Sequence, residues 1–231
     1  ALERAIRYFP AVGLLVGAQL APEKDFSRYD RLIDLGVDHL SICLEFWNPK
    51  YFSDICPGKE KMLGQKLFLE AMEYCAKRMP KGAVSGEIIA GIEPVEDTMA
   101  AIDYIAGLGA FPTVCVFRPT VGADMESWPP PKYDEMRAVM LHVYEACRKN
   151  WIPIGAAPNI EVSLVVNPDD AALLAPRDRA FWAYEAYRRA ARVLAAPLFA
   201  WRSRARARRI PGVSGGGATA GPAPRDGSAA A

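Results

Sequence analysis

A junction in which a helix ends at glycine and a strand follows at once occurs three times in the first half of this chain. The three junctions are Gly36–Val37, Gly82–Ala83 and Gly109–Phe111. Strands that alternate with helices in this way predict βαβ units, and therefore an α/β fold with a parallel sheet. The repeat of roughly 35–45 residues favours a (β/α) barrel, or a segment of one, and an open doubly wound sheet stays as the alternative.

The expected elements follow from apolar periodicity and from glycine and proline stops. We expect strands at 12–17, 37–46, 83–91 and 111–119, with possible short strands near 152–156 and 161–166. We expect helices at 25–36, 62–79, 94–109, 132–150 and 177–200. The segment 46–61 reads as a long aromatic loop with a turn at 57–59.

These elements divide the chain into three parts. Residues 1–168 form the barrel segment, 169–200 a helical extension, and 201–231 an Arg-rich and then low-complexity tail that we expect to be disordered. The five arginines between 202 and 209 could touch RNA or lipid headgroups, but such runs more often lie in solvent. The net charge of +1 favours neither nucleic acid nor membrane, and no apolar run is long enough to span a bilayer.

Cysteine usage and the N-terminus bear on the compartment and on the extent of the chain. The five cysteines are scattered without a CxxC-type motif, which indicates buried thiols in a reducing, cytoplasmic compartment. Two histidines are too few for a histidine-based metal site. The segment 1–10 shows no signal-peptide pattern, lacks an initiator methionine and reads like the end of a helix. We therefore expect the sequence to start partway through a larger protein.

The strand 37–46 carries the first candidate site residues. In parallel α/β folds ligands bind at the carboxyl ends of the strands. Strand alternation puts Ser41, Cys43 and Glu45 on one face, with Glu45 at the rim. A rim carboxylate suits ribose hydroxyls or an ammonium group, although a simple ion pair with a nearby lysine would also explain it.

The strand 83–91 supplies a second carboxylate. Alternation turns Glu87 to the same interior as Cys43, where an unpaired charge is costly and needs a partner or a ligand. Gly91 at the strand end allows close backbone approach. The acids that follow, Glu93 and Glu96 among them, surround a helix N-terminus and are interpreted as structural.

Three cations are placed to reach a ligand near these carboxylates. Lys59 and Lys66 follow the rim of the strand 37–46, and either could instead be an ordinary solvated lysine. Arg118 ends the strand 111–119 and is a candidate partner of Glu87 or of a ligand carboxylate.

Four short segments follow one another along the expected strands and their ends: CLE at 43–45, NPKYF at 48–52, GEIIAGIE at 86–93 and FRPTVGADM at 117–125. Taken in this order they resemble the radical S-adenosylmethionine (SAM) enzymes, in particular the biotin synthase and lipoyl synthase branch. The resemblance covers roughly residues 10–165. In that family one strand ends in an acidic element that holds the ribose or amino group, a small-residue strand packs against adenine, and a Pro-x-x-Gly element follows.

The resemblance implies a mechanism, a set of partners and a set of contacts. A reduced 4Fe-4S cluster splits SAM into methionine and a 5′-deoxyadenosyl radical, which abstracts hydrogen from a small substrate. An electron donor such as flavodoxin or ferredoxin would reduce the cluster, while no membrane or nucleic acid is expected. The implied cofactor contacts are Cys43 and Glu45 at the ribose or amino group, Lys66 (or, as second choice, Lys59) at the methionine carboxylate, Ile89, Gly91 and Ile92 against adenine, and Glu87 and Arg118 at cofactor or substrate.

This sequence departs from the family pattern in two ways. The C-x3-C-x2-C motif that holds the cluster is absent, so we expect those ligands upstream of Ala1, and this chain alone would be inactive. Val84 and Asn159 stand where biotin synthase has auxiliary-cluster ligands, which argues against that enzyme. Two alternatives stay open: another (β/α)-barrel lyase or isomerase that uses Glu87 and a lysine, and a non-catalytic barrel fragment.

Overall fold

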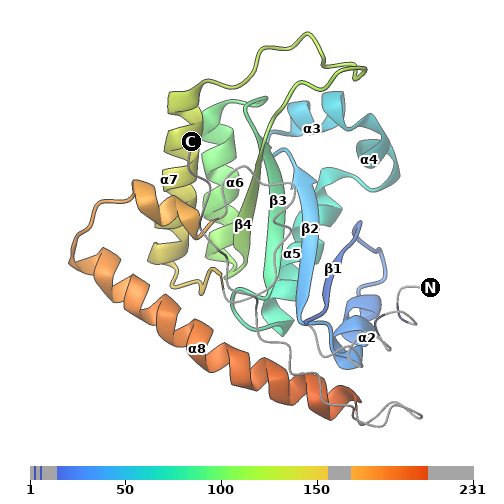
Figure 1. The fold of residues 1–231 in the computed structure, drawn as a ribbon. Helices are drawn as coiled ribbons and strands as arrows, with labels where there is room; N and C mark the ends of the chain where they lie inside the picture. The colour runs from blue at the N-terminus through green and yellow to red at the C-terminus, as the bar shows by residue number, and fades with distance from the viewer. Residues whose placement is uncertain (1–2, 4–5, 7–14, 156–167, 208–231) are drawn as a thin grey trace.

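A computed structural model describes residues 3, 6, 15–155 and 168–207 of the chain (Figure 1). Its centre is a parallel four-stranded sheet whose spatial order, β1-β2-β3-β4, is also the order along the chain. This confirms the α/β class and the parallel sheet. Within the described residues the strands do not close into a barrel. The strands are β1 (Gly17–Gln19), β2 (His39–Glu45), β3 (Val84–Ala90) and β4 (Phe111–Val116).

Helices occupy the connections and the C-terminal region. Three of them, α5, α6 and α7, cover one face of the sheet (Figure 1). The helices are α2 (Ser27–Leu35), α3 (Pro49–Ile55), α4 (Pro57–Met62), α5 (Gln65–Arg78), α6 (Val95–Gly107), α7 (Tyr133–Lys149), the 3-10 helix η3 (Asp170–Leu174) and α8 (Arg179–Ala207).

The predicted glycine junctions are real. Gly36, Gly82 and Gly109 have φ values of 96°, 78° and 81°, a left-handed conformation that glycine adopts without the Cβ penalty. At Gly36 the backbone N–H returns to the carbonyl of Ile33 at 2.9 Å, which ends α2 and turns the chain into β2. The sequence therefore identified the turns that make each strand parallel to the last.

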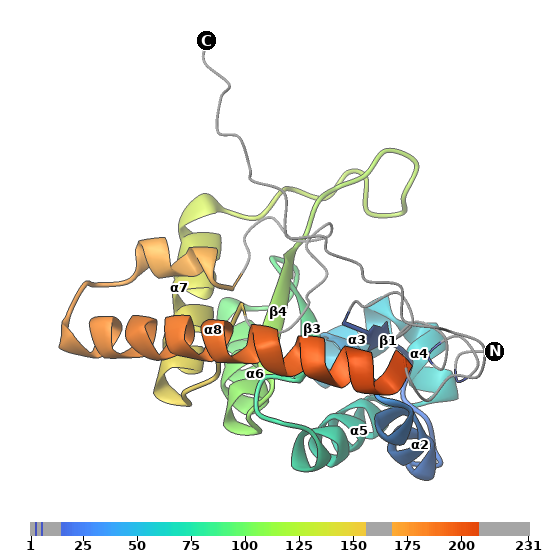
Figure 2. The same cartoon turned by 60° about the horizontal axis from the view of Figure 1, so that its bottom comes forward.

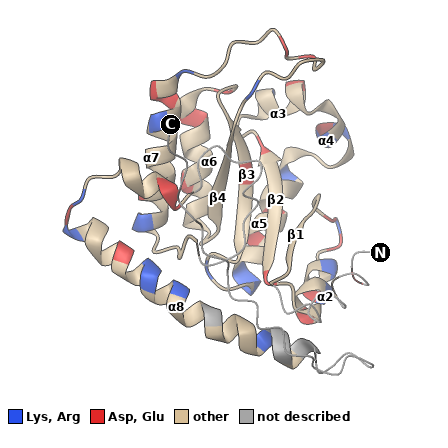
Figure 3. Cartoon of the chain, viewed as in Figure 1, with Lys and Arg blue, Asp and Glu red and all other residues tan. Residues whose placement is uncertain are grey.

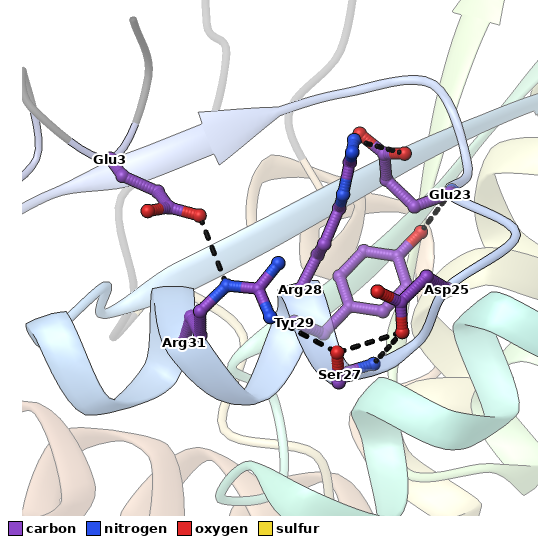
Figure 4. Close-up of polar contacts among 7 residues, drawn as sticks. All are labelled: Glu3, Glu23, Asp25, Ser27, Arg28, Tyr29 and Arg31. Atoms are coloured by element: carbon purple, nitrogen blue, oxygen red, sulfur yellow. Dashed lines mark hydrogen bonds and ion pairs between the residues drawn. The ribbon is translucent and has the colours of Figure 1, made fainter.

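Helix α2 begins with a local network of polar contacts (Figure 4). The Asp25 carboxylate accepts hydrogen bonds from the Ser27 backbone N–H at 3.1 Å and from its hydroxyl at 2.7 Å. The Tyr29 hydroxyl accepts from the backbone N–H of Glu23 at 2.9 Å, and Arg28 pairs with the Glu23 carboxylate at 2.8 Å. These contacts satisfy donors near the free end of the helix and fix how the chain enters it.

Alternation along β2 and β3 decides which side chains face the helices. Ile42, Leu44 and Ile88 are fully buried in the apolar core. A Cβ added to Gly86 would lie 2.7 Å from Ile105 Cδ1 and 2.8 Å from Met72 Cε, so this strand position is in close contact with α6 and α5. The odd-numbered positions of β3 consequently face the opposite side of the sheet.

Some predicted boundaries are wrong. The segment 46–61 is largely helical rather than a loop, because Pro49 and Pro57 each stand at the first position of a short helix, α3 and α4. Residues 152–155 do not form a strand, and the possible strand at 161–166 lies outside the described residues, as do residues 12–14 of the expected strand 12–17.

Helix α8 continues to Ala207, seven residues into the segment expected to be a tail. Its first half is fastened to the body: the Tyr184 hydroxyl donates to the Ile152 carbonyl at 2.5 Å, and Glu185 accepts from the Tyr144 hydroxyl at 2.8 Å. The helix crosses the end of the molecule at which the strands begin, as Figure 2 shows. Among the described helices, α8 included, none is both long and apolar enough to cross a membrane.

Candidate functional site

The carboxyl ends of the strands meet at one edge of the sheet, at the top in Figure 1. The segments that leave this edge are α3 and α4 after β2, the turn at 91–94 after β3, and the loop at 117–132 after β4. In parallel α/β folds this edge is where ligands bind, because loops from several strands converge there. The predicted site residues come from these strands and segments.

The Glu87 carboxylate is the centre of a buried polar cluster on the sheet face away from the helices. Its Oε1 accepts from the Ser41 hydroxyl at 2.7 Å. Its Oε2 accepts from Gln19 Nε2 at 2.6 Å and from the Cys43 thiol at 3.1 Å. Only 8% of the residue is exposed, and no lysine or arginine of the described residues forms an ion pair with it. The predicted inward orientation of Ser41, Cys43 and Glu87 is therefore seen, with neutral donors in place of a counter-ion.

Burial raises the pKa of the Cys43 thiol to about 12; Gln19 opposes the shift and the Glu87 carboxylate adds to it. Cys43 is accordingly a protonated hydrogen-bond donor at neutral pH, rather than a thiolate nucleophile. The Gln19 amide contacts both Cys43 Sγ, at 2.7 Å, and Glu87, so it bridges the two.

Three further polar side chains are buried beside this cluster. His39 Nε2, Ser85 Oγ and Thr113 Oγ1 have no hydrogen-bond partner among the described residues. Thr113 is the β4 register partner of Glu87, so the two side chains share a face of the sheet. Burial lowers the pKa of His39 to about 4, and its ring stacks on Phe111 at a centroid distance of 5.3 Å. Buried polar atoms without partners are costly, which marks this face as more than ordinary core.

At the rim, Glu45 forms an ion pair with Lys59 from α4. The Lys59 ammonium also donates to the Cys43 carbonyl at 3.2 Å and lies 5.4 Å from the centroid of the Phe68 ring. The side chains of Glu45 and Lys59 are 21% and 34% exposed, so a ligand can reach both. The pair offers a carboxylate for hydroxyl or ammonium groups and an ammonium for a carboxylate.

Glu45 has a φ of 70°, a left-handed value that is strained for a residue with a Cβ. The pairing of β2 with β3 shifts register between Cys43 and Glu45, so Glu45 pairs with Ile88 where strict alternation would not place it. The simple alternation that put Glu45 in line with Ser41 and Cys43 therefore does not hold at the last residue of the strand. The irregularity presents the carboxylate to the rim, toward α4.

Glu93 joins the segments that follow β2 and β3. Its carboxylate accepts from the backbone N–H of Trp47 at 3.0 Å and of Asn48 at 2.9 Å. Burial raises the pKa of Glu93, and these two backbone donors oppose the shift. Asn48 in turn caps α3 and donates to Asp97 at 2.8 Å. Glu93 has the structural role expected from the sequence, and it also fixes the start of the segment that carries Lys59.

The structure does not bring all predicted residues together. Lys66 is 86% exposed on α5, where it pairs with Glu70 at 3.3 Å. Arg118 is exposed in the segment after β4 and does not pair with Glu87.

The predicted adenine contacts lie at the end of β3. Gly91 has a φ of 98°, and a Cβ on it would lie 2.2 Å from Pro131 Cγ, so the loop 117–132 makes the close approach there. Ile89 and Ile92 are half-buried on either side of Gly91. The adenine contact stays a prediction, and an adenine ring could lie against Gly91 only if Pro131 moved away from it.

Sequence reasoning missed Gln19 and Thr113. Gln19 lies beyond the expected strand 12–17, and only its register pairing with Ser41 reveals that it faces Glu87. Thr113 lay within an expected strand, but a single threonine in an apolar strand carries no distinctive signal. A signal for Gln19 existed: it is an amide directly between apolar residues, Ala18 and Leu20.

Comparison with known proteins gives one informative similarity. The chain resembles a hydroxylase. The bacteriochlorophyllide c C-7(1)-hydroxylase of Chlorobaculum limnaeum is 32% identical to it over 122 residues. No family model matches the chain, and no solved structure matches it.

The similarity is partial in both proteins. It covers 52% of this chain and 30% of the hydroxylase, so the chain spans less than a third of that enzyme's length. This overlap links the chain to an enzyme without establishing a family.

Proposed function

We propose that this chain is a portion of a radical SAM enzyme. In the proposal it binds SAM, and a 4Fe-4S cluster would supply the reductive cleavage of SAM to methionine and a 5′-deoxyadenosyl radical, which would abstract hydrogen from a small substrate. An electron donor such as flavodoxin or ferredoxin supplies the electron. The observation that carries the proposal is the Glu45–Lys59 pair at the carboxyl end of β2, next to the inward cluster around Glu87.

The geometry at the rim supports a zwitterionic ligand. SAM carries ribose hydroxyls, an ammonium group and a carboxylate. Glu45 matches the hydroxyls or the ammonium, and Lys59 matches the carboxylate. Lys59 replaces Lys66 as the favoured cation, because it already contacts Glu45 while Lys66 pairs with Glu70. Without a ligand, Glu45 and Lys59 neutralise each other. Binding of SAM would replace this ion pair with two, one from Glu45 to the ligand ammonium and one from Lys59 to the ligand carboxylate.

The inner face supports a second role, that of holding a substrate. Glu87 holds Cys43 and Gln19 in fixed positions, and Ser85 and Thr113 bring hydroxyls with unused hydrogen-bonding capacity. A largely buried polar face of this kind would orient a substrate and keep water from a reactive intermediate. On this basis we propose that Glu87 contacts the substrate.

The described residues do not fit a 4Fe-4S cluster. They contain no group of three or more Cys, His, Asp or Glu able to hold a metal ion. The Cys43 thiol is also engaged with Glu87 and Gln19. The proposal therefore assigns no residue of this sequence as a ligand of the 4Fe-4S cluster.

The similar hydroxylase supports hydrogen abstraction in particular. Its name states that it hydroxylates a carbon position, and hydroxylation at carbon replaces a C–H bond. Breaking such a bond is what the resemblance to radical SAM enzymes implies for this chain. The substrate class that we carry over is no narrower than a small organic molecule.

Binding of SAM tests the proposal. Equilibrium dialysis of the 231-residue chain against radiolabelled SAM should show saturable binding that S-adenosylhomocysteine competes for. Glu45→Gln should weaken binding by about tenfold, the value of one charge-assisted hydrogen bond. Glu70→Gln is the matched control, because it removes a carboxylate that is also paired with a lysine but lies away from the rim. No binding, or equal loss in both variants, would contradict the assignment.

The lyase or isomerase alternative finds less support in the geometry. It requires a lysine close to Glu87, and within the described residues no lysine forms an ion pair with Glu87, while Lys59 is held by Glu45. No observation in the described residues favours it over the proposal.

A further inference from the structure

The outer side of helix α8 is apolar along most of its length. At 3.6 residues per turn, the exposed residues from 182 to 201 that point away from the body fall on one side of the helix. We call this side the outer stripe. It consists of Trp182, Ala183, Ala186, Ala190, Val193, Leu194, Pro197, Leu198 and Trp201.

The large residues of the outer stripe are truly exposed. Their exposed fraction is between 51% and 72% for Val193, Leu194, Leu198 and Trp201. The opposite side of the same helix is the one that contacts the protein, through Phe181 and other residues of the first half. The stripe spans 20 positions, about 30 Å at 1.5 Å per residue. Exposed apolar surface of this extent marks a binding surface.

From residue 186 onward the charged residues of α8 are all arginine. Residues 186–209 contain eight arginines and neither Asp nor Glu. Within the described residues one of these arginines, Arg188, is held by Glu185 at 3.0 Å, and another, Arg192, reaches Asp169 at 3.2 Å but stays exposed. Figure 3 shows the described ones among these basic positions as blue segments along α8.

Charge and shape together select one partner. A second copy of this chain would bring two strongly basic helices together without an acid to offset them, and their repulsion opposes such a dimer. A nucleic acid would accept the arginines but would leave the apolar stripe in water. An anionic lipid surface accepts both, because phosphate headgroups pair with arginine while Leu, Val and Trp enter the boundary beneath them.

We propose that α8 lies flat on an anionic membrane surface, with the outer stripe buried in the headgroup boundary. The helix does not cross the bilayer; it rests in the interface plane, where tryptophan is favoured. The proposal departs from the expectation of no membrane partner and from the solvated Arg-rich segment that the sequence alone suggested, since α8 continues into that segment as far as Ala207. The inference is independent of the proposed SAM chemistry, which takes place at the opposite end of the strands.

Vesicle flotation with the full chain tests it. The protein should float with phosphatidylcholine vesicles that contain about 30% phosphatidylglycerol, and not with pure phosphatidylcholine; raising the salt to about 0.5 M should release much of it. Trp182 and Trp201 should give a blue-shifted emission on binding that is lost when both are replaced by Phe.

The decisive variant is Leu194→Glu with Leu198→Glu, which should lower partitioning more than tenfold, because burial of each leucine contributes about that factor. Glutamate is a good helix former, so circular dichroism should show the helix intact. The matched control is Met62→Glu with Val121→Glu, which alters two apolar residues at least as exposed as the two leucines, at the other end of the molecule.

Four results would overturn the inference. They are no flotation of the wild type, equal binding to neutral vesicles, equal loss in the control variant, and concentration-dependent dimerisation in ultracentrifugation that the Leu194/Leu198 variant abolishes. The last result would assign the stripe to a second copy of the chain.

Discussion

The backbone at Glu45 offers a direct test of the idea that this rim is a functional site. Left-handed conformations cost a residue with a Cβ about 1–2 kcal/mol, and glycine escapes that cost. Glu45 is at φ 70°, so Glu45→Ala should keep the strain and Glu45→Gly should release it. Both variants lose the ion pair with Lys59 equally, so the difference between them isolates the backbone.

The expected magnitude follows from two opposing terms. Glycine gains about 1–2 kcal/mol from the released strain and loses about 0.5–1 kcal/mol to its greater freedom in the unfolded chain. Glu45→Gly should therefore be about 1 kcal/mol more stable than Glu45→Ala. In urea unfolding this corresponds to a midpoint about 0.5 M higher, for a slope of about 2 kcal/mol per molar.

The matched comparison uses Glu70, on the exposed side of α5. There the order should reverse, because glycine in a helix is about 1 kcal/mol less favourable than alanine. Circular dichroism and tryptophan fluorescence should report the same transitions, and both Glu45 variants should lose SAM binding to the same extent. If Glu45→Ala is as stable as Glu45→Gly, the positive φ holds no strain, and the inference from strain to function at this residue fails.

Three further changes test the interior. Burial holds the pKa of His39 at about 4, against 6.5 in the unfolded chain. The folded protein should therefore keep its full stability above pH 6.5 and lose up to about 3 kcal/mol of it as the pH falls toward 4. His39→Gln should remove this loss, measured as the urea midpoint at a series of pH values. Gly86→Ala should cost about 1–3 kcal/mol by overpacking against Ile105 and Met72, measured as a fall in thermal midpoint, and an unchanged midpoint would refute the close contact. Glu87→Ala should cost about 1–3 kcal/mol in chemical denaturation, because the buried Ser41 hydroxyl and two less buried donors lose their acceptor, and a neutral result would show that the Glu87 contacts are not coupled to folding.

The site was partly predictable from the sequence. Cys43 and Glu87 follow from alternation along two strands, and their contact in the structure agrees with that reading. Lys59 was only a second choice for the ligand carboxylate, since nothing in the sequence shows that residues 57–62 form a helix that aims it at Glu45. Lys66 was the first choice for that carboxylate, yet in the structure it lies in solvent on α5, paired with Glu70.

The sequence by itself determined the alternation of strand and helix and the glycine turns that make the strands parallel. Those features depend on local periodicity and on backbone freedom at single residues, and both can be read from neighbours in the chain. Only the tertiary structure decided the register shift that re-aims Glu45, the bridge from Gln19 to Glu87, and the direction in which the apolar side of α8 points. Each of these depends on which distant segments lie side by side, and pairing over such sequence separations leaves no periodic signal in the chain itself.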